Sequence, residues 1–449
     1  MRRYIPSTDA DRAAMLGEIG VERVDDLFAD IPEEVQLNQP LDLPEALSEP
    51  ELVAFMKQLS HACASAEQYT YLLGAGCYSH HIPSIIDHIL TRSEFYTAYT
   101  PYQPELSQGT LQVMFEFQTM VCQLTGMDVA NASMYDCATA VAEAAMMAGR
   151  IVRNRDTVVV ARSVHPEYRA VLKGYLGRLG MKSQEFNFGA NGQVSIDSLK
   201  QNLGEHVAAI VVQSPNFFGV IEDLAEVTDA AKTAGALSIV AVSEPISLGL
   251  LKPPGEFGVD IVVGQAQSLG IPMSFGGPHL GFFACRDKHV RQMPGRLAGR
   301  TVDHNGRPGF VMTLATREQH IRRARATSNI CTNHQLCALA AAVYMSTMGK
   351  AGMRELAELN VLKTDYAKRQ LSEMGVKPLF SGPTFNEFAL KSVRPVDAVN
   401  EALLGRKVVG GLGLARFYDE FDENAMLACF TENVSKEAID AFSEEVIRQ

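Results

Sequence analysis

The segment Phe257-Gly-Val-Asp-Ile-Val-Val-Gly264, followed by Gln265-Ala-Gln-Ser-Leu-Gly-Ile-Pro-Met-Ser-Phe-Gly-Gly-Pro278, decides the fold class of this chain. Its first part is a short run of apolar and β-branched residues, which is typical of a strand buried on both faces. Its second part is rich in glycine and proline, which is typical of a loop. The segment therefore predicts a buried strand that ends in a long loop.

Strands and helices alternate on both sides of this segment. Short apolar runs predict further strands, and the tracts between them carry helical patterns, as in residues 166–179 and 224–234. Continuous apolar strands that alternate with helices form parallel sheets covered on both faces, so we expect an α/β protein with a mostly parallel sheet. The predicted strands are residues 157–161, 207–213, 237–242, 259–263 and 280–284.

The two ends of the chain differ from this central region. Prolines break short helical patterns in residues 1–75, where Met15, Ile19 and Leu27 are predicted to anchor an arm on a larger body. A new pattern of strands and helices begins near residue 345. The predicted organisation is therefore an N-terminal helical arm (1–75), a large α/β domain (76–344) and a small C-terminal α/β domain (345–449).

Composition argues against several classes of protein. The net charge of -12 argues against a nucleic-acid binder, and no run of 18 apolar residues predicts a membrane span. The eight cysteines form no Cys-x-x-Cys pair and the histidines show no metal-ligand spacing, so we expect reduced core thiols and no metal site. Because the N-terminus lacks a hydrophobic signal core, the chain is predicted to be cytoplasmic.

The loop after residue 264 lacks a lysine. In pyridoxal-phosphate enzymes, a loop of this kind carries the lysine that binds the cofactor covalently. No lysine occurs between positions 253 and 287, and Gln265, Gln267 and Ser268 cannot form an imine. The sequence predicts a scaffold without its own reactive amine, which either performs different chemistry or works beside a partner that supplies the lysine.

Two helices are predicted before the first long strand. Residues 106–126 carry an apolar stripe at spacings of three and four, and Gly126 is placed to end this helix. Ser133-Met-Tyr-Asp136 resembles a capping box that opens an alanine-rich helix. Free amides at such a helix start can bind phosphate, but Cys137 is not the glycine that close approach would favour, so we expect a simple cap.

A proline-rich tract at residues 95–109 presents aromatic and polar side chains on a stiff loop. Phenols and an amide on a rigid loop can bind a small carboxylate or a partner's cofactor. Aromatic packing of a surface loop explains the same composition, and both interpretations stay open. The candidate site residues here are Tyr96, Tyr99, Tyr102, Gln103 and Glu105.

Basic residues gather between positions 293 and 325, although the chain is acidic overall. Such a cluster can bind a phosphate, a substrate carboxylate or acidic groups of a partner, and a solvated helix face is the alternative. The short Thr327-Ser328-Asn329 run fits helix capping or ligand binding equally. Cys331 near His334 also leaves a cysteine nucleophile open. The candidate anion or partner contacts are Arg296, Arg317, Arg322 and Arg323.

Taken together, eight strings of this sequence resemble glycine decarboxylase, the P-protein family of the glycine cleavage system, over nearly the whole chain. The resemblance is to the N-terminal half of that protein, which some bacteria encode as a separate subunit 1. Cys137 departs from the family pattern, which usually has glycine there. The strings are Tyr99–Gly109, Met127–Asn131, Ser133–Asp136, Val164–Tyr168, Ser274–Pro278, Met293–Arg296, Thr316–Arg323 and Ala326–Cys331.

The resemblance implies a fold type I (aspartate-aminotransferase-like) architecture and a role in the oxidative decarboxylation of glycine. It implies that a second, lysine-bearing subunit holds pyridoxal phosphate, in a complex with two copies of each chain. It also implies that the aminomethyl group passes to the lipoyl group of the carrier H-protein. This chain alone would then hold no catalytic residue, and residues 99–105 and 327–329 would complete the partner's pocket. The alternatives are a non-catalytic assembly subunit and an autonomous fold type I enzyme with different chemistry.

Overall fold

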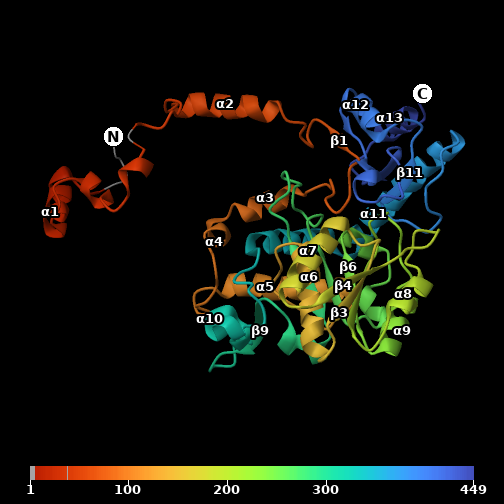
Figure 1. Cartoon of the computed structure of the whole chain (residues 1–449), viewed down its shortest axis with the longest axis horizontal. Helices are drawn as coiled ribbons and strands as arrows, with labels where there is room; N and C mark the ends of the chain where they lie inside the picture. Colours follow the sequence, from red (N-terminus) through yellow and green to blue (C-terminus); the bar gives the residue numbers. More distant parts are fainter. Residues whose placement is uncertain (1–5, 38, 449) are drawn as a thin grey trace. The chain divides into compact units, whose positions relative to one another are not determined.

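This computed structural model describes residues 6–37 and 39–448, and the chain separates into two compact units, Met1–Cys63 and Ala64–Gln449. The first unit contains helices α1 (Asp9–Ile19) and α2 (Glu49–His61), joined by a segment with two short 3-10 turns (Figure 1). Neither helix buries a residue. This unit is the part of the chain for which the prolines and apolar anchors predicted an arm.

A seven-stranded sheet forms the centre of the second unit, in the order β2-β8-β7-β6-β5-β3-β4. Neighbouring strands from β4 to β7 run parallel, while β8 is antiparallel to β7 and β2 is antiparallel to β8. The strands are β2 (Val129–Ala130), β3 (Thr157–Ala161), β4 (Lys182–Phe186), β5 (Val207–Gln213), β6 (Leu237–Val242), β7 (Ile261–Gln265) and β8 (Gly281–Cys285). The mostly parallel sheet expected from the sequence is confirmed.

Helices cover this sheet because its strands are apolar on both faces. Every residue of β3, β5, β6 and β7 is buried. Helix α6 packs against β5, β6, β7 and β8, whereas α9 packs against β5 and β6. The helices of this part are α3 (Ser84–Leu90), α4 (Ser93–Tyr96), α5 (Gln108–Thr125), α6 (Cys137–Ile151), α7 (Pro166–Arg178), α8 (Ile196–Asn202), α9 (Leu224–Ala234), α10 (Gln319–Arg322) and α11 (Gln335–Glu373).

The C-terminal residues form a second, three-stranded antiparallel sheet in the order β11-β14-β13. Its apolar core is separate and includes Phe388, Phe430 and Phe442. Two smaller pairings complete the fold: β1 (Thr70–Tyr71) with β12 (Val408–Val409), and the hairpin β9 (Leu297–Val302) with β10 (Pro308–Thr313). The remaining elements are β11 (Glu387–Lys391), α12 (Val396–Leu404), β13 (Leu412–Gly413), β14 (Ala425–Cys429) and α13 (Lys436–Ile447). The predicted boundary near residue 345 stays a prediction.

Two local predictions are wrong. Asp136, not Ser133, caps α6, because the backbone of Met134 is already bonded to Gly281, the first residue of β8, and the helix starts only after this bridge. Strand β7 also ends two residues later than predicted, since its hydrogen bonds to β8 continue to Gln265. Gln265 is therefore the last residue of a buried strand and not the first residue of the loop, which fixes the direction of its side chain.

We predict that Gly219→Ala destabilises the chain far more than Gly180→Ala. Both glycines have positive φ (80° and 70°), so each substitution costs about 1 kcal/mol in backbone strain. A Cβ at Gly219 would lie 1.9 Å from the carbonyl oxygen of Glu387, whereas nothing lies within 4 Å at Gly180. Overpacking should raise the loss at Gly219 to roughly 2–4 kcal/mol. Denaturant unfolding of both variants measures this, and equal losses would contradict the close approach.

Candidate functional site

The carboxyl ends of the parallel strands are the first place to look for a site, because open α/β sheets bind ligands there. Five polar side chains lie at the ends of β5, β6 and β7 or just after them, and all are buried. They are Gln213, Ser243, Glu244, Gln265 and Gln267. Their hydrogen bonds decide whether this edge of the sheet is open to a ligand.

Gln265 closes the N-terminus of α6. Its Oε1 accepts a hydrogen bond from the backbone N–H of Cys137 at 3.0 Å, and its Nε2 contacts Nδ1 of His279. Asp136 Oδ1 accepts from the N–H of Thr139 at 2.7 Å. Side chains of this chain therefore occupy two of the amides that a phosphate would need.

The other two positions that could have carried a lysine are also engaged. The carboxamide of Gln267 accepts from the N–H of Tyr78 at 2.9 Å and donates to its carbonyl at 3.1 Å. The hydroxyl of Ser268 donates to Oε1 of Glu244 at 2.8 Å. The residues at this edge thus do not fit covalently bound pyridoxal phosphate, since no amine is present and the polar groups satisfy one another.

A carboxylate cluster lies beside this edge, in which Glu244 and Glu387 are buried and Glu432 is half-buried. Tyr78 and His80 are its other members, and both are buried. His80 bridges Glu244 and Glu432, with both nitrogen–oxygen distances at 2.8 Å. Burial lowers the pKa of His80, but the two carboxylates outweigh it and raise the pKa to about 10. The charged imidazole therefore joins the segment before α3, the end of β6 and the loop after β14.

Tyr78 makes the second link in the carboxylate cluster. Its hydroxyl donates to Oε1 of Glu387 at 2.8 Å, and the N–H of Ala75 donates to Oε2 at 3.0 Å. Burial raises the pKa of Glu387 to about 7, an increase that these hydrogen bonds only partly offset. The cluster consists of groups that bind one another, which is typical of a structural connection.

The tyrosine loop (residues 95–109) presents its rings at the surface. Tyr99 is 78% exposed, and Tyr96 and Tyr102 are more than half exposed. Gln103 and Glu105 are exposed as well. The hydroxyl of Tyr99 makes no hydrogen bond to any residue that the structure describes, so it is available to another molecule.

Arg296 lies beneath this loop and holds it in place. The guanidinium is only 2% exposed and donates to the Tyr102 hydroxyl at 3.1 Å and to Thr100 Oγ1 at 3.3 Å. It also lies 5.4 Å from the centre of the Tyr102 ring. Nη1 donates to Thr332 Oγ1 at 3.0 Å, and Nε lies 3.6 Å from a carboxylate oxygen of Glu318. Arg296 is thus a support of the loop.

The four candidate arginines separate into two kinds. Arg317 is buried like Arg296, and its guanidinium donates to the carbonyls of Met293 and Gly295. Arg322 and Arg323 are exposed. Sequence proximity alone did not distinguish them, because burial depends on how residues 293–299 and 315–332 pack together.

Residues Thr327–Asn329 line a cavity of about 1000 Å³ between α6, α7 and the segment after α10. The hydroxyl of Ser328 donates to Oε1 of Glu143 at 2.7 Å, while Oε2 of Glu143 is buried without a hydrogen-bond partner among the described residues. Burial raises the pKa of Glu143. Of the arginines that the sequence singled out, Arg323 lines this cavity; the others that line it are Arg150 and Arg178.

The tyrosine loop and the 327–329 segment are connected but do not share this cavity. Thr327 donates its N–H to the carbonyl of Arg317 at 3.0 Å, and Arg317 holds the turn that precedes Arg296. The sequence missed Glu143, Arg150 and Arg178, because they lie on alanine-rich or amphipathic helices without a motif. For Glu143 and Arg150 the sequence offered one signal, a charged residue on an otherwise apolar helix.

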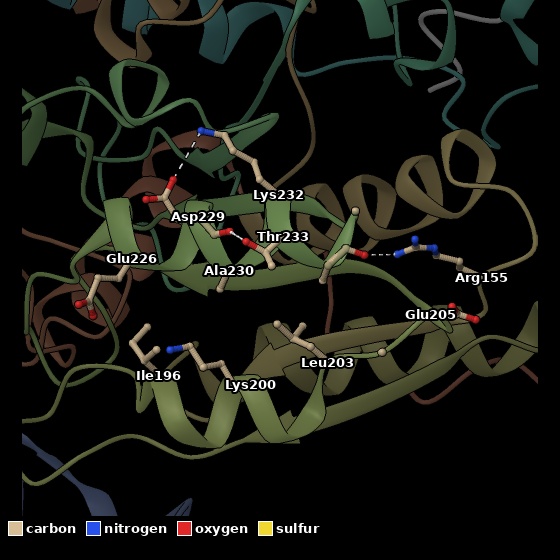
Figure 2. Close-up of a pocket in the computed structure, with 13 residues that line it drawn as sticks. Arg155, Ile196, Lys200, Leu203, Glu205, Glu226, Asp229, Ala230, Lys232 and Thr233 are labelled. Carbon is tan, nitrogen blue, oxygen red and sulfur yellow. Dashed lines mark hydrogen bonds and ion pairs between the residues drawn. The ribbon is translucent and has the colours of Figure 1, made fainter.

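A second cavity, of about 940 Å³, lies between α8 and α9 (Figure 2). Arg155 donates to the carbonyls of Val207 and Ala234 at 2.8 Å, so it completes the ends of two elements. Lys232 is 3.9 Å from Asp229 across one helical turn. This cavity is at the amino ends of β5 and β6, opposite the edge where a parallel sheet binds ligands, and its charges neutralise one another.

Other site chemistries find no support in residues 6–37 and 39–448. His334 Nδ1 contacts the carbonyl of His279 at 2.6 Å, and no hydrogen bond joins His334 to Cys331. No group of three His, Cys, Asp or Glu side chains in these ranges is arranged for a metal ion. No helix in them has the length and apolar character needed to cross a membrane.

The architecture is that of fold type I pyridoxal-phosphate enzymes. A sphingosine-1-phosphate lyase from Burkholderia pseudomallei superimposes with a TM-score of 0.67 at 14% identity, covering 93% of each chain. Such low identity shows the fold alone.

Sequence relationships place the chain more narrowly. A family model described as "Glycine cleavage system P-protein" matches residues 2–446, so the chain belongs to that family. It is 51% identical over 438 residues to a probable glycine dehydrogenase (decarboxylating) subunit 1 from Desulfitobacterium hafniense, covering 97% of both. An inhibitor-bound crystal structure of glycine decarboxylase (P-protein) is 45% identical, with a TM-score of 0.88 and 99% coverage of both chains.

We predict that Glu387→Gln flattens the dependence of stability on pH. The folded-state pKa of about 7 lies above the usual value of 4.5, so the folded chain holds the proton more tightly. Stability from this group is therefore complete below pH 4.5 and lost as the pH rises through 7. A glutamine cannot ionise; its oxygen can accept from the N–H of Ala75 while its Nε2 donates to the Tyr78 hydroxyl.

Thermal unfolding of wild type and variant at pH 5 and pH 8 measures the effect. The variant should lose less stability than wild type between the two pH values. Part of the pH dependence should remain, because burial also raises the pKa of Glu222 to about 7. Exposed Glu205→Gln is the control. Parallel profiles for Glu387→Gln and wild type would contradict the buried, protonated carboxyl.

Proposed function

We propose that this chain is subunit 1 of a two-subunit glycine dehydrogenase (aminomethyl-transferring, decarboxylating) of the glycine cleavage system, acting in the cytoplasm. A second subunit supplies the lysine and binds pyridoxal phosphate, and this chain completes its pocket from across the interface. The observation that carries the proposal is the pairing of P-protein family membership with a closed cofactor edge, where Gln265 bonds to the N–H of Cys137.

In this function glycine loses carbon dioxide, and its aminomethyl group passes to the lipoyl group of the H-protein. The lipoyl disulfide is the electron acceptor: one sulfur takes the aminomethyl group and the other becomes a thiol. Pyridoxal phosphate supplies an electron sink for decarboxylation when it is bound to the partner. None of these steps requires a catalytic residue of this chain.

This chain contributes positioning groups. Tyr99 has an exposed side chain on a loop that Arg296 supports, and Glu105 adds an exposed carboxylate to the same loop. A rigid loop loses little conformational freedom when a partner binds, so its groups are pre-organised. Tyr96, Tyr102 and Gln103 lie on the same loop and complete this candidate surface.

A second set of contacts involves the cavity beside α10. Thr327, Ser328 and Asn329 line it together with Arg323. The Thr327 hydroxyl, the Asn329 amide and the Arg323 guanidinium are donors suited to an anionic group, whereas the Ser328 hydroxyl already donates to Glu143. Arg322 is exposed nearby on α10 and suits acidic groups of the partner. We place two copies of each subunit in the assembly, since subunits of one ancestral fold pair by two-fold symmetry.

We predict that the purified chain carries no covalently bound pyridoxal phosphate. The lysine-free stretch from 253 to 287 includes the end of β7, whose last residue is Gln265. Borohydride reduction in the presence of the cofactor, followed by peptide mapping, should tag the second subunit and leave this chain unmodified. A stoichiometric tag on any lysine of the isolated chain would instead favour an autonomous enzyme.

We predict that Tyr99→Phe lowers the exchange of labelled bicarbonate into glycine by the reconstituted complex roughly tenfold to a hundredfold. Loss of a hydrogen bond to a charged group costs about 1.5–3 kcal/mol, which sets this range. Assembly and melting temperature should stay unchanged, because the hydroxyl has no bond within the described chain.

Tyr102→Phe serves as the comparison, because it removes an internal bond from Arg296 and should lower stability as well as activity. Wild-type exchange rates for both variants at saturating H-protein would show that the loop does not complete the site. They would leave a purely assembling subunit as the better description.

A further inference from the structure

The cavity of about 1000 Å³ between α6, α7 and the segment after α10 combines charged groups with an apolar wall. Its volume is at the upper end of the range that holds small organic ligands, roughly 300–1000 Å³. A lining of this kind suits a molecule that is charged at one end and apolar at the other. The charged lining residues are Glu143, Arg150, Arg178 and Arg323, and the apolar side chains are Met146, Val171, Leu179, Met181, Ala324 and Ala326.

Two polar atoms of α6 are buried at this cavity without a hydrogen-bond partner among the residues that the structure describes. They are Oε2 of Glu143, a residue only 1% exposed, and Nε of Arg150. Folded proteins rarely leave buried polar atoms unsatisfied, because each one costs free energy. Ser328 bonds only to Oε1 of Glu143, and Nη2 of Arg150 donates to the carbonyl of Gln292 at 3.2 Å. The cavity therefore offers one unused acceptor and one unused donor.

These two groups carry opposite charges on the same helix. Seven residues separate Glu143 from Arg150, which is about 10.5 Å along the axis, and helical side chains lean toward the N-terminus, so Arg150 reaches back toward Glu143. The Arg150 charge lowers the pKa of Glu143, but burial outweighs it and raises that pKa. Burial likewise lowers the pKa of Arg150. Within residues 6–37 and 39–448 neither group has an ion pair, so each lacks a close opposite charge.

The unused groups indicate a zwitterion. A carboxylate without a donor favours an ammonium group, and a guanidinium without an acceptor favours a carboxylate. Arg178 and Arg323 line the same cavity, so the negative end of a ligand meets more than one cation. The apolar wall accepts an uncharged side chain. A free α-amino acid with an apolar side chain has all three of these parts.

A glycine in the interior of α7 helps to keep the cavity open. Glycine destabilises a helix relative to alanine, yet a Cβ at Gly174 would meet nothing within 4 Å, so no neighbouring atom requires a glycine there. Gly174 lines the cavity, and any larger residue would project into it. Gly177 lies almost one turn further along α7 and also has nothing within 4 Å, but it does not line the cavity. The two positions form a matched pair for substitution.

We propose that this cavity binds a free α-amino acid with an apolar side chain of about the size of leucine. Its ammonium group donates to Oε2 of Glu143, its carboxylate accepts from Arg150 and Arg323, and its side chain packs on the apolar wall. Glu143 also binds Ser328, so the bound amino acid lies against the 327–329 segment. The site needs no residue of a second subunit, and the inference does not depend on the proposed function.

The test measures binding of L-leucine to the full-length chain by isothermal titration calorimetry, beside two probes of similar shape. Isocaproate is leucine without the amino group, and isoamylamine is leucine without the carboxylate. Each probe should bind roughly tenfold to a hundredfold more weakly than leucine, the range for losing one hydrogen bond to a charged group. Glycine should also bind more weakly than leucine, because it leaves the apolar wall empty.

Three variants locate the ligand. Glu143→Gln should weaken leucine binding roughly tenfold or more, because an amide is a weaker partner for ammonium than a carboxylate, and should change isocaproate binding less than about twofold. Gly174→Leu should weaken leucine binding roughly tenfold or more by filling the cavity, whereas Gly177→Leu should change it less than about twofold. Circular dichroism and the melting temperature check that each variant folds.

Several outcomes would overturn the inference. Isocaproate binding as tightly as leucine would leave a site for simple anions, and equal effects of Gly174→Leu and Gly177→Leu would place the ligand elsewhere. Absence of leucine binding at millimolar concentration would remove the site. Addition of a lysine-bearing P-protein subunit should leave the leucine affinity unchanged, and loss of binding would show that the partner fills the cavity. Glycine–bicarbonate exchange is not read in these experiments, so the proposed function is tested separately.

Discussion

The hydrogen bond from the Cys137 N–H to the Gln265 carboxamide is the interaction on which the character of this protein depends. A helix N-terminus leaves backbone N–H groups without partners, and a buried one left unsatisfied costs about 1–3 kcal/mol. In a fold type I enzyme a cofactor phosphate can meet that need. Here the last residue of β7 meets it from within the chain, and its Nε2 extends the contact to His279. The edge of the sheet is thereby a stable structural element without a ligand.

Because this edge of the sheet is closed, its polar side chains are not available to bind a ligand. In the carboxylate cluster beside it, His80 binds both Glu244 and Glu432 and so joins three parts of the second unit. Removing the charged imidazole would leave the carboxylates of Glu244 and Glu432 without this partner, which is costly because Glu244 is buried and Glu432 is half-buried. The groups left available are in the tyrosine loop over Arg296 and in the cavity beside α10. Both are features that another molecule can contact.

The two units differ in how many internal contacts support their surface residues. Arg296 and Arg317 bury their guanidinium groups under the loops that they support, so the exposed tyrosines stand on a fixed base. The first unit buries no side chain of α1 or α2. The loops over Arg296 and Arg317 are thus pre-organised for positioning.

Sequence alone determined the elements whose pattern is local. Residues 207–213 and 224–234 were predicted with the bounds of β5 and α9, because continuous β-branched runs and an amphipathic stripe reflect burial directly. The lysine-free stretch is likewise a property of the sequence, and it limits the chemistry because no other side chain there can form an imine. Strand β4 was missed because most of its residues are polar, and the β9–β10 hairpin was missed because glycine and proline interrupt its strand pattern.

Only the tertiary structure decided how those residues act. Arg296 and Arg317 carry the same charge as Arg322 and Arg323, yet the first two are buried supports and the last two are exposed, because packing of distant loops sets their solvent access. Asp136 displaced Ser133 as the cap of α6 because a bridge to Gly281 holds the preceding residues extended. Gln265 accepts a hydrogen bond from Cys137, which lies 128 residues away in the sequence. This contact exists only once the sheet and the helix have packed together.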